Sequence, residues 1–147
     1  KSRQGQESET AADTTELTGR HFLVAEDNEL NAEILTELLD LEGVTCDLAV
    51  NGEEALKLFR ASEPGFYDVI LMDVQMPVMD GYTATRTIRL CNHPDAKKIP
   101  IAAMTANAFA GDVQNALQSG MDAHVAKPID MNILKNTILK LLAEKRG

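Results

Sequence analysis

The sequence is poor in cysteine, in positive charge and in long apolar runs, and each shortage excludes a class of protein. Cys46 and Cys91 are the only cysteines and fit neither a metal-ligand spacing nor a disulfide framework, so we expect two reduced thiols. Lys and Arg number 14 against 23 Asp and Glu, and the net charge of -9 argues against nucleic acid, which requires clustered basic side chains. No apolar run approaches the roughly 20 residues that cross a bilayer, and no signal-peptide pattern occurs, so we expect no membrane contact.

The rest of the composition is ordinary for one globular domain, with 44% hydrophobic and 25% charged residues in 147. The first 20 residues are an exception because Leu17 is their one large apolar side chain. Such a segment buries too little surface to offset the entropy of ordering, so we predict a disordered tail or interdomain linker at 1–20. We expect the folded domain to span 21–143, with a short tail at 144–147.

From residue 21 onward, short apolar runs alternate with amphipathic segments. Runs of strand length occupy 21–25, 44–50, 67–72, 99–104 and 123–126, and segments with helical spacing follow each of them. We expect Asn51, with Glu54 three residues on, to cap the second helix and Asp130 to cap the last. The apolar stripe of the fourth helix is outlined by four residues: Phe109, Val113, Ala116 and Leu117. Strands that lack polar alternation and are separated by helices predict a parallel sheet covered on both faces. Because crossovers are right-handed, the compact order for five strands is 2-1-3-4-5, a doubly wound α/β fold with five helices.

Polar side chains follow four of the predicted strands at the point where each strand ends. Glu26 and Asp27 follow the first strand, Asp73 the third, Thr105 the fourth and Lys127 the fifth. Ligands bind beyond the carboxyl ends of the strands in such sheets, so we expect these residues to lie together. Three neighbouring carboxylates repel one another and require a cation, and oxygen ligands without His or Cys favour Mg²⁺ or Mn²⁺. The set suits phosphoryl transfer to a carboxylate, with Asp73 as nucleophile and with Thr105 and Lys127 binding phosphoryl oxygens.

Simpler explanations and other functions remain open at this point. Taken singly, Asp73 can belong to a turn, Thr105 to a helix cap and Lys127 to the solvated surface; their joint occurrence in strand order favours a site. One alternative is a Mg²⁺-dependent phosphohydrolase with an aspartyl-phosphate intermediate, although Gln75 stands where such enzymes often place a second acid. Another is a flavodoxin-like cofactor binder, but the loop "EDNELN" after the first strand lacks the glycines that cradle a phosphate.

Four motifs in this order, "VAEDNELN", "DVILMDVQMPVMDG", "AAMTANA" and "AKPID", resemble those of response-regulator receiver domains of two-component signalling. The resemblance covers about 21–143 and is greatest to the receivers at the carboxyl end of hybrid sensor histidine kinases. It implies a flavodoxin-like receiver fold that takes a phosphoryl group from a partner phosphohistidine, and that catalyses its own phosphorylation and dephosphorylation. The implied partners are a histidine kinase, a histidine-phosphotransfer domain or both, and the implied location is cytoplasmic, including the cytosolic part of a membrane-bound hybrid kinase.

The resemblance also implies a metal-binding set around the phosphoacceptor, Asp73. Asp27 would ligate Mg²⁺ directly, Glu26 would act more through water, and Gln75 would contribute its backbone carbonyl.

The remaining implied roles concern contact with the phosphoryl group and the conformational switch. Thr105 would be the switch hydroxyl, and Lys127 would contact the phosphoryl group, with a cis bond to Pro128. We expect Thr105 to move toward the phosphoryl group and the loop through Ala106 and Asn107 to follow. The residue three before this lysine is often aromatic in the family and is His124 here. Two alternatives stay open for His124: a part in the switch, in which its charge would make the step pH-sensitive, or an ordinary place at the strand end.

A partner phosphohistidine must approach Asp73 between the first predicted helix and the loop after Lys127. On that helix, one stripe at helical spacing is expected to face the sheet: Leu30, Ile34, Leu38 and Leu41. Asn31 and Leu35 lie on a neighbouring stripe, and we expect them nearer solvent, with Pro128 and Ile129 across the pocket as a small apolar docking rim. Leu35 can equally belong to a wider core-facing stripe.

Overall fold

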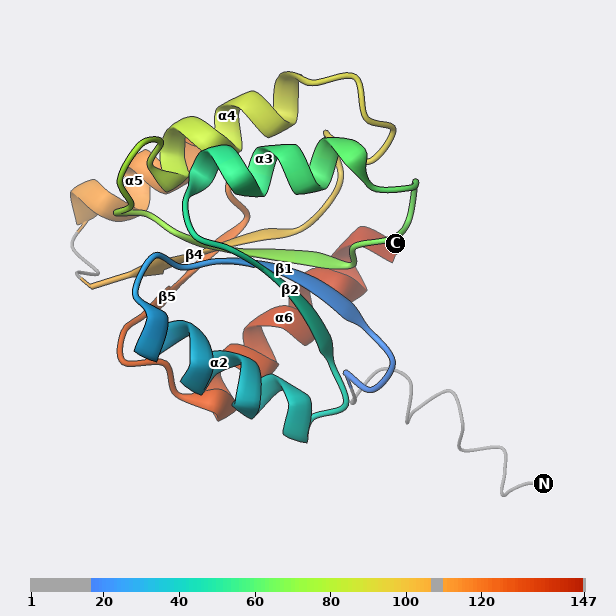
Figure 1. Ribbon diagram of the computed structural model, residues 1–147, viewed down its shortest axis with the longest axis vertical. Helices are drawn as coiled ribbons and strands as arrows, with labels where there is room; N and C mark the ends of the chain where they lie inside the picture. Colours follow the sequence, from blue (N-terminus) through green and yellow to red (C-terminus); the bar gives the residue numbers. More distant parts are fainter. Residues whose placement is uncertain (1–16, 107–109, 147) are drawn as a thin grey trace.

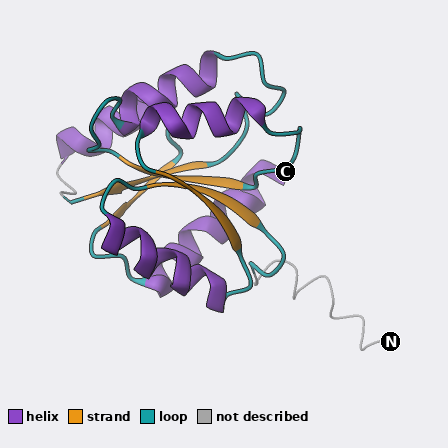
Figure 2. Cartoon of the chain, viewed as in Figure 1, coloured by secondary structure: helices purple, strands orange, loops and turns teal. Residues whose placement is uncertain are grey.

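The computed structural model describes residues 17–106 and 110–146, in which five parallel strands form one sheet between two layers of helices (Figure 1 and Figure 2). The strand order is β2-β1-β3-β4-β5, as predicted from the sequence. In chain order the elements are β1 His21–Ala25, α2 Glu29–Leu41, β2 Thr45–Ala49, α3 Gly52–Ala61, β3 Val69–Asp73, α4 Gly81–Leu90, β4 Ile101–Thr105, α5 Ala110–Ser119, β5 Ala123–Ala126 and α6 Met131–Arg146. None of the helices in the described part combines the length and apolarity needed to span a membrane.

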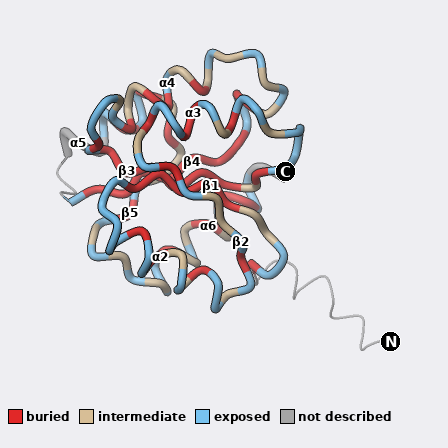
Figure 3. The backbone as a smooth tube through the Cα atoms, in the orientation of Figure 1, coloured by how far each residue is buried: buried red, intermediate tan, exposed pale blue. Residues whose placement is uncertain are grey.

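The two faces of the sheet carry separate apolar cores. Helices α2 and α6 cover one face, and α3, α4 and α5 cover the other (Figure 1). Alternate residues of β1 divide between the two cores, so that Phe22 and Val24 pack on the α2 side and Leu23 on the α3 side. Strand β3 is buried along its whole length (Figure 3), which explains why its sequence reads as a continuous apolar run up to Asp73.

Capping side chains set where the helices begin. The predicted cap Asn51 accepts a hydrogen bond from the Glu54 N–H at 2.8 Å, and the Glu54 carboxylate accepts one from the Val50 N–H at 2.9 Å. Asp130, the other predicted cap, accepts from the Ile133 N–H at 3.2 Å. These local interactions place the strand-to-helix loops at one edge of the sheet.

Both predicted boundaries of the domain need correction. Leu17 is fully buried in the same α2-side core as Phe22, so packed residues of the described chain precede residue 21. Helix α6 continues through Arg146, well past the predicted end at 143. Residues 1–16 of the predicted tail, and the predicted helical residue Phe109, lie outside the described residues. Leu117 was expected on the core side of the fourth helix but is 59% exposed.

The predicted core-facing stripe of the first helix is wrong. Leu30, Ile34 and Leu41 are 63%, 48% and 82% exposed, and α2 instead buries a stripe formed by Ala32, Leu35 and Leu39. The helix carries two apolar stripes with similar spacing, so periodicity alone does not distinguish them. The tertiary structure decides the rotation, because the Asn28 cap and the short connection from β1 fix how the helix enters.

The loop after β3 packs against two glycines that tolerate no side chain. A Cβ on Gly81 would lie 2.2 Å from the Asp73 carbonyl oxygen, and one on Gly52 would lie 2.5 Å from the Met79 carbonyl oxygen. Within the same loop, Val78 adopts a φ of 69°, and the Met79 N–H donates to the Pro77 carbonyl at 2.7 Å. This tight loop holds the backbone of Asp73 in place.

We predict that Gly81→Ala lowers the free energy of unfolding by about 2–3 kcal/mol, because the new methyl group overlaps backbone rather than a flexible side chain. The matched control is Gly65→Ala, where φ is +80° but no atom lies within 4 Å of the added Cβ. The control should lose about 1 kcal/mol, the cost of the left-handed conformation alone. Urea unfolding of both variants measures the difference, and equal losses would contradict the steric explanation.

Candidate functional site

A lysine bridges two buried carboxylates at the carboxyl edge of the sheet. The Lys127 ammonium lies 2.9 Å from Glu26 Oε1 and 2.9 Å from Asp73 Oδ2. The carboxylate side chains are only 2% and 5% exposed, and the lysine side chain is 22% exposed. Three residues separated by up to a hundred positions in the sequence thus form one charge cluster, as their positions after β1, β3 and β5 predicted.

Backbone N–H groups orient the two carboxylates. The Gln75 N–H donates to Asp73 Oδ1 at 3.1 Å, and the Asn28 N–H donates to Glu26 Oε2 at 3.1 Å. Both donors lie two residues after their acceptor, in the turn that follows the strand. Asn28 is a site residue that the sequence argument missed; its position as a cap just after two acids was the available signal.

Burial and the neighbouring charges perturb the site in a consistent way. Burial raises the pKa of Glu26, and the hydrogen bonds from Lys127 and Asn28 offset only part of that effect. Burial by itself would lower the pKa of Lys127, but the hydrogen bonds to Asp73 and Glu26 outweigh it and the pKa is raised. The lysine is therefore held as a cation beside its two carboxylates.

A third carboxylate completes a group that could hold a metal ion. Oxygen atoms of Glu26, Asp27 and Asp73 lie within 4.8 Å of one another, and Asp27 is exposed while the other two are buried. Carboxylate oxygens in this number suit a hard divalent cation with water in its remaining positions. The group is open to solvent on the Asp27 side, from which an ion and a phosphoryl group can enter.

The other predicted site residues are distributed around this group. Thr105 ends β4 and is buried, and Gln75 is exposed beyond Asp73. The Lys127–Pro128 bond is cis, as the family resemblance implied. His124 lies in the edge strand β5 with an exposed side chain. The predicted movement of the loop through Asn107 concerns a residue outside the described part of the chain.

A groove beside the charge cluster contains all four predicted docking residues. A cavity of about 380 Å³ is lined by Asn31, Leu35, Pro128 and Ile129, and also by Glu26 and Lys127. Leu35 is only 3% exposed, so of the two positions left open for it the core-facing one is confirmed, and it forms part of the floor rather than the solvent-facing rim. The apolar wall on α2 comes from Ile34 and Leu38, which the sequence argument had assigned to the core.

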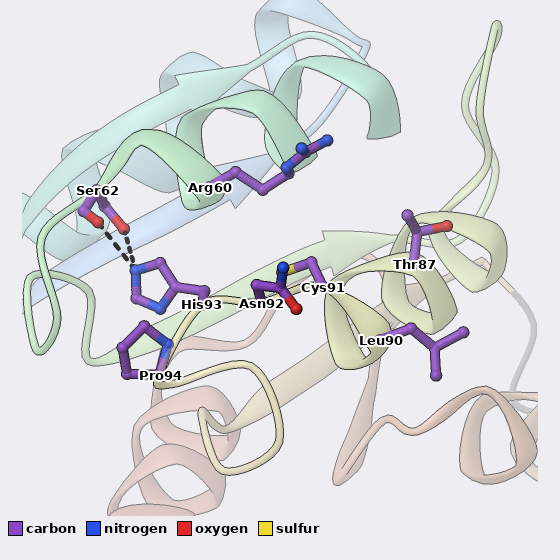
Figure 4. Close-up of a pocket in the computed structure, with 8 residues that line it drawn as sticks. All are labelled: Arg60, Ser62, Thr87, Leu90, Cys91, Asn92, His93 and Pro94. Carbon is purple, nitrogen blue, oxygen red and sulfur yellow. Dashed lines mark hydrogen bonds between the residues drawn. The ribbon is translucent and has the colours of Figure 1, made fainter.

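A second cavity of about 650 Å³ lies away from the predicted site, at the carboxyl ends of α3 and α4 (Figure 4). There, Ser62 Oγ lies 3.2 Å from His93 Nε2, a spacing reminiscent of nucleophilic catalysis. However, His93 Nδ1 accepts the Asp95 N–H at 3.0 Å, so the ring proton is on Nε2 and is donated to the Ser62 carbonyl at 2.9 Å. Since this nitrogen has no free lone pair for Ser62, the arrangement fastens the loop after α4 to α3 and has no catalytic character.

Comparison with protein families and curated proteins gives a consistent result. The model of the response regulator receiver domain matches residues 22–139. The chain is 44% identical over 120 residues to hybrid signal transduction histidine kinase G of Dictyostelium discoideum. The matched region covers 80% of this chain and 3% of that protein. It is 36% identical over 137 residues to the peroxide stress-activated histidine kinase mak1 of Schizosaccharomyces pombe, which covers 92% of this chain and 8% of that protein. The chain thus spans a small fraction of the length of these relatives.

Solved structures with the same fold include two that bear on the site. One is the receiver domain of a sensor histidine kinase from Pseudomonas aeruginosa, which has a magnesium ion coordinated in its active-site cleft. It is 36% identical to this chain with a TM-score of 0.76, and the match covers 86% of this chain and 99% of that chain. A chain from a Saccharomyces cerevisiae complex matches at 28% identity with a TM-score of 0.74. The match covers 86% of this chain and 90% of that chain. That complex joins the histidine phosphotransfer protein Ypd1 to the receiver domain of its response regulator Ssk1.

We predict that Lys127→Met lowers the free energy of unfolding of the metal-free protein by about 2–4 kcal/mol, since it leaves two buried carboxylates without their cation. The control is Lys135→Met, which removes a lysine 3.0 Å from Glu42 in a pair whose side chains are 30% and 29% exposed. The control should cost less than about 1 kcal/mol. Urea unfolding with a chelator at neutral pH compares them, and a loss for Lys127→Met no larger than the control's would contradict this assignment.

Proposed function

Because the chain belongs to the family of response regulator receiver domains, we propose that it accepts a phosphoryl group from a partner phosphohistidine on Asp73. The observation that carries the proposal is the Lys127 ammonium 2.9 Å from Asp73 Oδ2, beside two further carboxylates in the same cluster. Such a site presents an ionised oxygen nucleophile next to a fixed positive charge. The phosphorylated domain then shifts its conformation or passes the phosphoryl group to a histidine-phosphotransfer protein.

In the proposed reaction a carboxylate oxygen of Asp73 attacks the phosphorus atom of the phosphohistidine. The bond between phosphorus and the histidine nitrogen breaks, and the nitrogen keeps the electron pair. Lys127 remains charged and binds an oxygen of the arriving phosphoryl group, while the Gln75 N–H holds the carboxylate in place. Positioning and electrostatics supply the catalysis, and no general acid is required.

We propose Mg²⁺ as the cofactor, held directly by Asp27, Asp73 and the backbone carbonyl of Gln75, and through water by Glu26. The donor set fits, because it offers carboxylate and carbonyl oxygens without nitrogen or sulfur. When bound, the ion neutralises carboxylate repulsion and the negative charge of the phosphoryl group. The magnesium in the cleft of the Pseudomonas receiver supports this choice over Mn²⁺.

The proposed switch is a shift between two positions of the Thr105 hydroxyl at the end of β4. Phosphorylation favours the conformation in which this hydroxyl reaches a phosphoryl oxygen, so the equilibrium moves toward it. His124, on the neighbouring strand β5, has an exposed ring that is free of the close packing of the core and can change rotamer with this shift.

We also propose that the phosphodonor docks over the groove formed by Asn31, Leu35, Pro128 and Ile129, which opens onto Lys127. A histidine kinase or a histidine-phosphotransfer domain can bring its phosphohistidine to Asp73 along this path. The yeast complex with Ypd1 supports the second class, and the hybrid kinases among the relatives support a role within such a kinase.

The direct test of the phosphoacceptor is Asp73→Asn, which retains the shape of the side chain but removes the nucleophilic oxygen. Incubation with Mg²⁺ and acetyl phosphate, followed by mass mapping, should label Asp73 in the wild type and nothing in the variant. Asp80→Asn is the matched control, since Asp80 lies in the same loop and caps α4, a role that Asn also fills. Undiminished labelling of the Asp73 variant on another residue would contradict the assignment.

The switch is tested by Thr105→Val, which should still be labelled but should no longer transmit the change. Amide spectra with and without beryllofluoride should show a reduced response at Ala106 and in α5. Thr105→Ser retains the hydroxyl and should respond as the wild type does. A valine variant that responds fully would remove Thr105 from the switch.

A further inference from the structure

Helix α2 exposes an unusual apolar stripe next to the groove. Leu30, Ile34 and Leu41 are 63%, 48% and 82% exposed, and the half-buried Leu38 connects them along the helix. Ile34 and Leu38 also line the cavity of about 380 Å³ that contains Glu26 and Lys127. Apolar side chains that are contiguous at the surface and border a functional site indicate a binding surface.

An acidic row runs along the same helix beside this stripe. Its members are exposed and recur at spacings of four, four and three residues: Glu29, Glu33, Glu37 and Asp40. Side chains at these spacings are neighbours on a helix and repel one another when they have the same charge. Helix α2 contains no Lys or Arg, and within the described residues no salt bridge joins these four acids to a cation. The row therefore adds repulsion that no ion pair among the described residues relieves.

The opposite wall of the groove provides apolar surface and no spare positive charge of its own. On this side of the groove, Pro128 and Ile129 line the cavity. The lysine that lines this wall, Lys127, is already paired with Glu26 and Asp73 at 2.9 Å. An incoming partner thus meets an apolar centre flanked on one side by uncompensated negative charge.

We propose that α2 selects its phosphodonor by charge, binding a partner helix that presents apolar residues flanked by a row of Lys or Arg. The proposal rests on the proposed function and specifies the partner of that site. The acidic row extends over the 12 residues 29–40, about 16 Å or three turns, which a partner helix of ordinary length matches. Apolar contact with Leu30, Ile34 and Leu41 supplies affinity, and the acidic row steers association and rejects acidic partners. A second copy of this chain is disfavoured as occupant, because its own acidic row would face the first.

The test exchanges charge on both sides of the contact. The receiver variant is Glu33→Lys with Glu37→Lys, and the control is Glu53→Lys with Glu63→Lys, an equal change in net charge at exposed positions outside α2. The probes are a phosphorylated histidine-phosphotransfer domain with a lysine-rich helix beside its active histidine, and the same domain with those lysines changed to glutamate. Phosphotransfer rates are measured at low and high salt, with acetyl phosphate labelling and melting temperature recorded for every receiver.

The wild type should accept from the lysine-rich probe about tenfold faster than the α2 variant does at low salt, and the difference should shrink at high salt. The α2 variant should recover with the glutamate probe, and the control should behave as the wild type. Phosphotransfer rates that change neither with the charge of α2 nor with the charge of the probe would overturn the proposal. A dimer of the wild type that is detected by sedimentation and is lost in the α2 variant would also overturn it. Absent labelling by acetyl phosphate in the wild type would instead refute the proposed function.

Discussion

The interaction on which the site depends is the Lys127 ammonium between Glu26 and Asp73. Two nearly fully buried carboxylates would repel each other strongly, and the lysine compensates both through contacts of 2.9 Å. The three residues come from the ends of β1, β3 and β5, so the cluster joins the centre of the sheet to its edge. The same charge that stabilises the resting site is in position to receive a phosphoryl group, which links stability directly to the proposed chemistry.

The surrounding backbone keeps this cluster in register. Gly81 lets the start of α4 lie directly against the Asp73 carbonyl oxygen, and Gly52 lets the start of α3 lie against the Met79 carbonyl oxygen. The Gln75 N–H donates to the Asp73 carboxylate. Asn28 does the same for Glu26 while it caps α2, the helix that forms one wall of the groove. The loops that orient the acids thus also set the positions of the partner-facing surfaces.

The sheet order, the clustering of Glu26, Asp73 and Lys127, and two helix caps could be predicted from the sequence because each rests on a local pattern. Asp73 after a continuous apolar run and Asn51 three residues before Glu54 are patterns of this kind. The rotation of α2 could not be predicted, because its two apolar stripes have similar spacing and only packing against the α2-side core separates them. Leu35 accordingly belongs to the floor rather than the rim, and Leu30, Ile34 and Leu41 changed from core to surface. Leu17 was misassigned because its burial depends on the distant α2-side core and not on its polar neighbours.

The central claim is that this edge of the sheet binds a divalent cation and a phosphoryl group together at Asp73. A crystal structure with Mg²⁺ and beryllofluoride, a mimic of the phosphoryl group, tests it most directly. The account predicts beryllofluoride bonded to an Asp73 carboxylate oxygen, Lys127 in contact with a fluorine atom, and Mg²⁺ ligated by Asp27, Asp73 and the Gln75 carbonyl. Beryllofluoride or Mg²⁺ bound elsewhere, with the Lys127–Asp73 contact unchanged, would contradict it.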